Sequence, residues 1–231
     1  MNFPALSSTI DGLFTGKIDE LPNKRGSSAI GKTAVSGLQK IDEFGLLQDE
    51  QADLENHGGH DKAIHHYPAD HYEKWIAEGE VPTGTVPAAF GENTSTLGLS
   101  ELNLCIGDKL RLGTAVVQIS QGRQPCWKVS EHTENKKMAY LFQKTSRTGW
   151  YYRVLEAGEV AVGDQVTLIE RTQPDWSVAR VTTARLTRKV SRSDAEVLAS
   201  LPELAIGWRD AFARMAAGNH QEDTSKRLVG S

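Results

Sequence analysis

Five of the seven histidines of this 231-residue chain lie between positions 57 and 71, in the sequence HGGHDKAIHHYPADH. Neutral imidazole is a common metal ligand, so this cluster is a candidate metal site. The spacing argues against zinc, because the HExxH pattern is absent and Gly58-Gly59 prevents a helix from presenting His57 and His60 together. A second interpretation is a glycine-rich loop whose backbone approaches an anion, with Lys62 adding positive charge. In a third interpretation, the histidines are structural and bond to neighbouring backbone.

Cys126 is a second candidate for chemistry. It follows a proline in a predicted loop and has two cations close by in the sequence, Arg123 and Lys128. Nearby cations favour the thiolate, which is the form that ligates a soft metal or attacks an electrophile. An inert loop cysteine is the competing interpretation. Cys105 differs, because it lies between leucine and isoleucine, and we predict that it is a small buried hydrophobic residue.

Two further segments have side chains that could reach a ligand. In the sequence FGEN at 90–93, Glu92 is a candidate general base and Asn93 is a candidate ligand to a polar group. A buried asparagine that satisfies loop backbone is equally consistent with this pattern. The sequence GWYYR at 149–153 predicts an aromatic strand that belongs to the core rather than to a cofactor platform.

The composition excludes several classes of protein. The chain has 26 basic and 30 acidic residues, and its net charge of -4 disfavours a general binder of nucleic acids or anionic membranes. No run approaches the ~18 apolar residues of a membrane span. Residues 1–12 lack the basic and apolar pattern of a signal peptide. The two cysteines exclude a disulfide-based scaffold, and we expect a cytoplasmic protein.

The elements that must position the candidate residues are mainly strands over residues 1–170. Glycine and β-branched residues dominate there, and turn signals recur at short spacing, as in an all-β barrel or sandwich. We predict two strands and a hairpin, at 9–18, 28–38 and 105–120. Two helices interrupt the strands, at 68–77 and 136–143, since each places large apolar side chains on one face.

The character of the sequence changes after the predicted barrel. Residues 171–176 indicate a linker, and residues 177–231 indicate a small all-helical domain. We predict three short helices in it, at 177–186, 193–201 and 203–216. Ser193 and Glu196 predict a capping box at the start of the second helix. These helices have too few apolar positions for a core of their own, so we expect them to dock on the barrel and the polar end of the chain to fray.

Taken together, these segments resemble a MOSC domain, and most closely the YiiM-like branch of that family, the bacterial 6-hydroxylaminopurine resistance proteins. The resemblance covers nearly the whole chain. It is carried by short segments in a fixed order: HGG at 57–59, DKA at 61–63, HYP at 66–68, FGEN at 90–93, IGD at 106–108, QISQ at 118–121 with Arg123, PC at 125–126, GW at 149–150, PDW at 174–176 and VAR at 178–180. Each segment is weak alone, but their order and spacing make the set specific.

This resemblance implies a mainly β, barrel-like fold with an appended three-helix domain, and a mononuclear molybdenum ion held by a pterin cofactor. It implies that Cys126 ligates the metal and is the catalytic residue. Reductases of the family convert N-hydroxylated bases and amidoximes to amines or amidines, with electrons from a separate redox protein. The residues that the resemblance implies as contacts of the cofactor are His57, Gly58, Gly59, Asp61, Lys62, Gln51, Asn93 and Arg123.

The chain departs from the family pattern at one place. Many MOSC sequences have a Gly-Asp-Arg type segment before the His-Gly-Gly sequence, whereas this chain has LQDEQ at 47–51. A phosphate-contacting arginine is therefore missing from that position. Gln51 could replace it as a neutral donor, or another cation such as Lys17 or Lys24 could reach the cofactor.

Three functions are compatible with the sequence. The first is the reduction of N–O bonds that the resemblance implies. The second is a non-enzymatic carrier, which holds the cofactor or sulfur on Cys126 and delivers it to another enzyme. The third is a zinc hydrolase built on the histidine cluster. A basic stretch in the tail is either a solvated helix face or a docking surface for an acidic electron donor, and its members are Arg180, Arg185, Arg188, Lys189 and Arg192.

Overall fold

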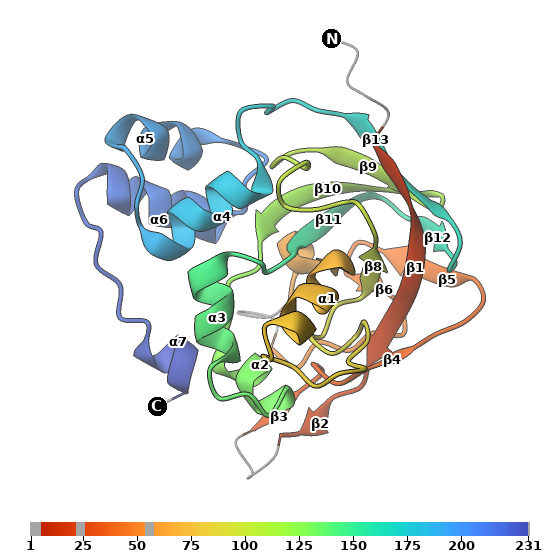
Figure 1. Ribbon diagram of the computed structural model, residues 1–231. Coiled ribbons are helices and arrows are strands. Elements are labelled where there is room, and N and C mark those ends of the chain that lie inside the picture. The colour runs from red at the N-terminus through yellow and green to blue at the C-terminus, as the bar shows by residue number, and fades with distance from the viewer. Residues whose placement is uncertain (1–5, 22–25, 54–57, 231) are drawn as a thin grey trace.

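The computed structural model describes residues 6–21, 26–53 and 58–230, and its centre is a closed β-barrel (Figure 1). The barrel strands are β1 (Ser7–Gly16), β7 (Ile64–Pro68), β8 (Thr94–Thr96), β9 (Lys109–Leu112), β10 (Ala115–Gly122), β11 (Trp150–Glu156) and β13 (Gln165–Glu170). Around the ring their order is β13-β9-β10-β11-β7-β8-β1, and β1 pairs with β13 to close it. Neighbours are antiparallel, except that β7 and β8 are parallel. The predicted mainly β, barrel-like fold is confirmed.

The hairpin of β9 and β10 shows how the sequence specifies barrel strands. Leu110 and Leu112 are buried while Arg111 between them is exposed, which is the alternation of a strand with one face in a core. The turn needs Gly113, whose φ is +60° and whose Cβ, if present, would lie 2.3 Å from the carbonyl oxygen of Glu159. The predicted hairpin is therefore correct in position, although its first four residues form a turn.

The predicted strand at 28–38 is wrong, whereas the one at 9–18 corresponds to β1. The range 28–38 contains only the end of β3 (Ser27–Ser28) and the three residues of β4 (Lys32–Ala34). β3 pairs with β2 (Asp19–Glu20), and β4 extends the sheet beyond β1. Between β3 and β4 the chain turns so that Ile30 packs against a buried aromatic cluster. This inward turn interrupts the strand.

The aromatic cluster lies under two helices that pack beside the barrel. These are α1 (Asp70–Ala77) and α3 (Met138–Thr145), and both were predicted within two residues of their ends. The short helix α2 (Trp127–His132) was not predicted. Five large rings of the cluster contact one another, those of Tyr67, Tyr72, Trp75, Phe90 and Phe142. A separate three-stranded sheet has the order β12-β5-β6, from β5 (Gln39–Asp42), β6 (Gly45–Leu46) and β12 (Gly158–Val160).

Three of the four C-terminal helices, the first three in the chain, pack together at one side of the barrel, and the last lies apart from them, beside α2 and α3 (Figure 1). They are α4 (Val178–Thr187), α5 (Arg192–Ser200), α6 (Ile206–Ala216) and α7 (Ser225–Val229). Val181 and Phe212 belong to the same continuous hydrophobic cluster as Ile106 and Leu112 of the barrel, so the helices share the core of the barrel. The division of the chain at 171–176 stays a prediction. No helix among the described residues is both long enough and apolar enough to cross a membrane.

The predicted capping box at α5 is wrong. The helix begins at Arg192, and its N-cap is Ser191, whose hydroxyl accepts a hydrogen bond from the amide of Asp194 at 3.0 Å. Glu196 instead accepts a hydrogen bond from the guanidinium of Arg192 at 2.9 Å. The serine two residues before the predicted cap therefore caps the helix.

The linker is anchored to the barrel by an ion pair. Arg171 donates from Nε to Asp108 Oδ1 at 2.8 Å and from Nη2 to the carbonyl oxygen of Asn103 at 2.9 Å. Asp108 is fully buried, and its other carboxylate oxygen also accepts from the amide of Cys105 at 2.8 Å. The turn before β9 and the entry to the C-terminal helices are thus held by one carboxylate.

We expect Arg171→Ala to lower the free energy of unfolding by about 3 kcal/mol, because it leaves the Asp108 carboxylate buried without its cation. Urea denaturation measures this loss. The matched control is Lys109→Ala, which removes an exposed pair with Glu170 and should cost less than about 1 kcal/mol. Equal losses in the two variants would contradict the anchoring role of Arg171.

Candidate functional site

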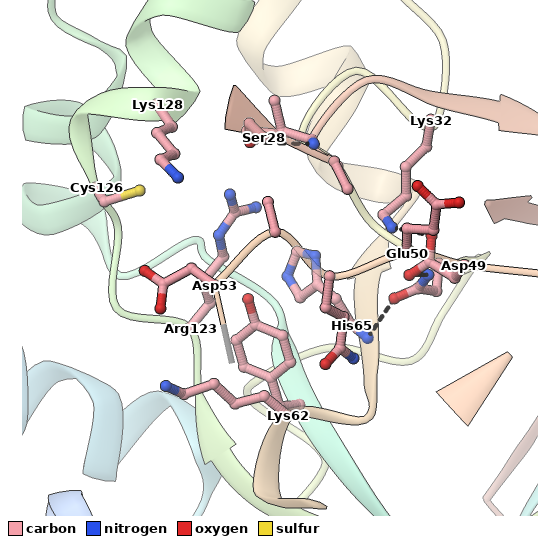
Figure 2. Close-up of a pocket in the computed structure, with 17 residues that line it drawn as sticks. Ser28, Lys32, Asp49, Glu50, Asp53, Lys62, His65, Arg123, Cys126 and Lys128 are labelled. Atoms are coloured by element: carbon pink, nitrogen blue, oxygen red, sulfur yellow. Dashed lines mark hydrogen bonds and ion pairs between the residues drawn. The ribbon is translucent and has the colours of Figure 1, made fainter. Parts of the chain in front are cut away.

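The structure contains a cleft with two connected parts, and Figure 2 shows the side chains that line the narrow part. The narrow part has a volume of about 80 Å³, and the wide part has a volume of about 1030 Å³. Both parts share six lining residues, which are Asp53, Lys62, Arg123, Cys126, Lys128 and Tyr151. Since Cys126 lies where the two parts meet, its thiol faces both a small polar recess and a space that suits a small organic ligand.

Cys126 lies at the first turn after the longest run of buried barrel strand. β10 ends at Gly122, and Cys126 then forms the extended N-cap of α2, with φ of -131° and ψ of 165°. Its carbonyl oxygen accepts a hydrogen bond from the amide of Val129 at 3.1 Å, which fixes the start of the helix. The side chain is largely buried, and its sulfur points into the cleft (Figure 2). The prediction that Cys126 lies in a loop is therefore correct, but the loop ends at this residue and the residues that follow form α2.

Arg123 lies in the middle of the cleft with its guanidinium group directed inward (Figure 2). Only 7% of the residue is exposed, and its Nη1 donates to the carbonyl oxygen of Phe90. Its backbone amide donates to the carbonyl oxygen of Gly149 at 3.1 Å. Arg123 is thus held at both ends while its charge stays beside Cys126, so the cleft keeps a fixed cation next to the thiol.

The narrow part contains a buried cation that the sequence did not indicate. The ammonium of Lys32, at the start of β4, lies 2.5 Å from Asp49 Oδ1. The other oxygen of Asp49 accepts from Nδ2 of Asn93 at 2.8 Å. Burial lowers the pKa of Lys32, although the charge of Asp49 opposes this effect. The stretch 47–51 lacks an arginine, but a cation from another strand lies beside it.

Of the two cations that the sequence suggested as substitutes, Lys17 does not line the narrow part. Lys17 is exposed and pairs with Glu50 at 3.0 Å, and Lys24 lies outside the described residues. Gln51 lines the narrow part, but its side-chain amide donates to the carbonyl oxygen of Phe44 at 3.2 Å, and its Oε1 accepts from the amide of Gly59 at 3.2 Å. Gln51 therefore positions the glycine loop.

The glycine loop forms the edge of the wide part of the cleft. Gly58, Gly59 and Asp61 line it, and Gly59 has a φ of +85° that favours glycine. Lys62 lines both parts, and burial lowers its pKa. The carboxylate of Asp61 accepts from Nε of Arg153 at 2.8 Å, so it is tied to β11. His57 lies outside the described residues.

The remaining histidines of the cluster point in different directions. His66 bonds to Thr96 at 2.9 Å and stacks on Trp150, with ring centroids 4.4 Å apart. His71 contacts the carboxylate of Glu101 at 2.8 Å. His65 lines the narrow part and contacts the carbonyl oxygen of Thr148 at 3.1 Å. Within residues 6–21, 26–53 and 58–230, no three His, Cys, Asp or Glu side chains are placed to hold a metal ion. The geometry of these buried histidines supports the structural interpretation.

The remaining candidates divide between core and cleft. Glu92 is fully buried, burial raises its pKa, and it accepts hydrogen bonds from the hydroxyl of Tyr72 and the amide of Ala88. It therefore stabilises its own loop from inside the protein. Trp150 and Tyr152 belong to the core as predicted, but Tyr151 between them lines the cleft. Strand alternation could have found Tyr151, because its side chain points opposite to its neighbours.

Comparisons with known proteins identify the family. The family model described as "MOSC domain" matches residues 53–167. Protein YiiM of Escherichia coli is 36% identical over 219 residues, which cover 94% of this chain and 97% of YiiM. The chain belongs to the MOSC domain family. The MOSC match begins next to the glycine loop and ends in β13, so it spans both the loop and Cys126.

Structures and a fungal relative extend this result. The crystal structure of Escherichia coli YiiM matches with a TM-score of 0.80 at 30% identity, covering 96% of this chain and 98% of that one. A protein of Gibberella moniliformis described as "Reductase" is 38% identical over 167 residues, which cover 71% of this chain and 30% of that protein. The likeness to YiiM includes the C-terminal helices, whereas the fungal protein is much longer than the part this chain matches.

We expect the stability of this protein to fall in mild acid because of its buried histidines. Burial lowers the pKa of His66 to about 3, and it lowers the pKa of His65 well below its usual value. The unfolded chain binds these protons near pH 6.5, so stability is full above that pH and falls towards pH 3, by about 1.4 kcal/mol per pH unit for each histidine. Urea denaturation from pH 7.5 to 5 measures this slope.

The variant His66→Gln separates the contribution of one histidine. It should be less stable at pH 7.5, yet it should show a smaller dependence on pH than the wild type, since one buried titrating group is gone. A variant with the same slope as the wild type would show that His66 takes up its proton in the folded state.

Proposed function

We propose that this protein is a molybdenum-cofactor-dependent reductase that converts N-hydroxylated compounds, such as 6-hydroxylaminopurine and amidoximes, to the amines or amidines. The observation that supports this most directly is the cleft itself, in which one cysteine sulfur points into a space lined by cations, and the side chains of Arg123 and Lys32 among them are buried. Membership of the MOSC family and a relative described as "Reductase" support the same class of reaction.

The residues of the cleft fit a molybdenum ion held by a pterin cofactor that carries a phosphate group. Cys126 offers a soft sulfur ligand, whereas hard carboxylate ligands would suit other metals. Lys32, Arg123 and Lys62 offer positive charge to a phosphate, and the backbone of Gly58-Gly59 lets a bulky group approach closely. When bound, the cofactor supplies the two-electron chemistry that removes the hydroxyl oxygen.

The residues of the chain bind and orient the other reactants. The wide part is lined by Trp127, Trp208 and Ile206, whose apolar surfaces suit a planar base and exclude water. Reduction of the N–O bond consumes two electrons and two protons and releases water. Burial raises the pKa of Tyr151, so its phenol stays protonated and can donate a hydrogen bond inside the cleft.

The electrons come from a separate redox protein in this proposal. The basic stretch of the tail does not form one exposed patch, because its arginines have acidic partners. Arg180 pairs with Asp194 at 2.9 Å and Arg192 pairs with Glu196 at 2.9 Å. Arg185 is turned inward, with 7% of its side chain exposed. This geometry favours the solvated or structural interpretation of that stretch over a docking surface.

We expect Cys126→Ser to abolish reduction of 6-hydroxylaminopurine while the protein stays folded, because a serine hydroxyl is a hard, poorly ionised ligand that cannot replace a thiolate on molybdenum. The assay uses protein purified from a host that makes the cofactor, with a chemical reductant. Turnover by the wild type separates an enzyme from a carrier, since a carrier binds the cofactor without turnover. Equal activity of the wild type and Cys126→Ser would show that Cys126 is not a ligand of the metal.

We expect Lys32→Gln to lower the pterin content of the purified protein about tenfold, because a charge-assisted contact to phosphate is lost. Pterin fluorescence after release from the protein measures this directly, without an activity assay. Lys17→Gln is the matched control, since Lys17 is exposed and directly follows Gly16, the residue that pairs with Lys32. Retention of full pterin content in Lys32→Gln would place the phosphate elsewhere.

A further inference from the structure

The polar end of the chain returns to the cleft and is not frayed as the sequence predicted. Gly218, with a φ of +86°, ends α6, and the chain then runs across to α7 beside α2 and α3 (Figure 1). On the way, His220 Nδ1 lies 3.2 Å from the carbonyl oxygen of Arg188. At the end of this path Leu228 packs against the aromatic cluster. Residues 219–230 therefore have contacts along their length.

One carboxylate holds the middle of this segment. Glu222 Oε2 lies 2.7 Å from Nη1 of Arg185 and 3.1 Å from Nη2 of Arg188, both at the end of α4. Its other oxygen lies 4.0 Å from Nε of Arg227. Three guanidinium groups in this space repel one another, so the Glu222 charge is what allows them to lie together. Without that charge the segment should leave α4.

The same segment forms hydrogen bonds to the loop that carries Cys126. Oε1 of Glu222 accepts from the side-chain amide of Gln124 at 3.3 Å. Arg227 donates from Nη1 to the carbonyl oxygen of Pro125 and from Nη2 to Oε1 of Gln143 at 3.1 Å. Two consecutive residues just before Cys126 are thus bonded to residues about a hundred positions further along the chain. A movement of residues 219–230 would therefore also displace loop 124–126.

The segment also closes one side of the cleft. Asp223, Lys226 and Arg227 line the wide part, as do Gly58 and Gly59 of the glycine loop. Its departure would widen the entrance next to the Cys126 sulfur.

We propose that residues 219–230 form a closing wall of the cleft, and that Glu222 and Arg227 are positioning residues that hold this wall against loop 124–126. The wall limits the size of molecules that reach Cys126. This inference goes beyond the proposed function, and it is tested without cofactor or turnover.

The test compares access to Cys126 for two reagents of different size. The full chain, purified without cofactor, reacts at one pH with N-ethylmaleimide and with a polyethylene-glycol maleimide, and mass spectrometry locates the label. Both reagents attack the same thiolate, so the ratio of their rates reports access and not ionisation. We expect Glu222→Gln and Arg227→Gln to raise the ratio of bulky to small labelling about tenfold, because each removes charge-assisted hydrogen bonds that close the wall.

Two controls separate positioning from general loss of structure. Glu196→Gln breaks an exposed Glu–Arg pair on α5 and should leave the ratio unchanged. Arg227→Lys keeps the charge and should restore most of the protection lost in Arg227→Gln. Cys105 is buried, so label at Cys105 in Glu222→Gln would show that this variant has lost its general structure. In that case the comparison of Arg227→Gln with Arg227→Lys tests the proposal. An unchanged ratio in Arg227→Gln, or equal access of both reagents to the wild type, would overturn the proposal.

Discussion

The pairing of β10 with β11, and of β11 with β7, is the constraint on which the cleft depends. Gly122 lies opposite Trp150, and Trp150 lies opposite His66. This register aligns Tyr151 with Gln121 on one side and with His65 on the other, so three neighbouring strands each contribute a residue to the cleft, although more than fifty residues separate His65 from Gln121 in the sequence. At the start of β11, a Cβ on Gly149 would lie 2.2 Å from the carbonyl oxygen of His66. The close approach of the strands therefore requires glycine there, and a shift of register would turn Tyr151 away from the cleft.

Electrostatics sets the second condition for the cleft. A cation removed from water needs a carboxylate or carbonyl oxygen close by, since desolvation is unfavourable for the charged form. Lys32 has Asp49 as its partner, and Arg123 has the carbonyl oxygen of Phe90. Because these partners fix each cation in place, the cleft presents positive charge without rearrangement. Salt screens buried charges less than surface charges, so this field persists at physiological ionic strength.

The local pattern predicted more of the fold than of the cleft. Strand alternation, turn residues and the order of the short segments indicated a β-barrel with docked helices, and the helices α1 and α3 lie close to their predicted ranges. The strand at 28–38 failed because Ile30 is drawn into a cluster built from residues distant in the sequence. The sequence did not indicate a role for Lys32 or Glu222 for the same reason. No local pattern identifies Asp49 as the partner of Lys32 or Arg185 as the partner of Glu222, because only the fold brings these residues together.

The closure of the barrel has a consequence for how the chain folds. β1 is the first strand, yet it pairs with β13, with Ser7 opposite Thr167. On the ribosome, β4 can pair with the Phe14–Gly16 part of β1 early, but the Ser7–Thr9 part must wait for about 160 further residues to be synthesised, at roughly 5–20 residues per second, before β13 covers its edge. Its other neighbour, β8, also follows late. Long-range pairing of this kind folds slowly and leaves an open strand edge that can join another chain. The nascent protein is thus most prone to aggregation before β13 emerges, and chaperones that cover the open strand edge should raise the soluble yield.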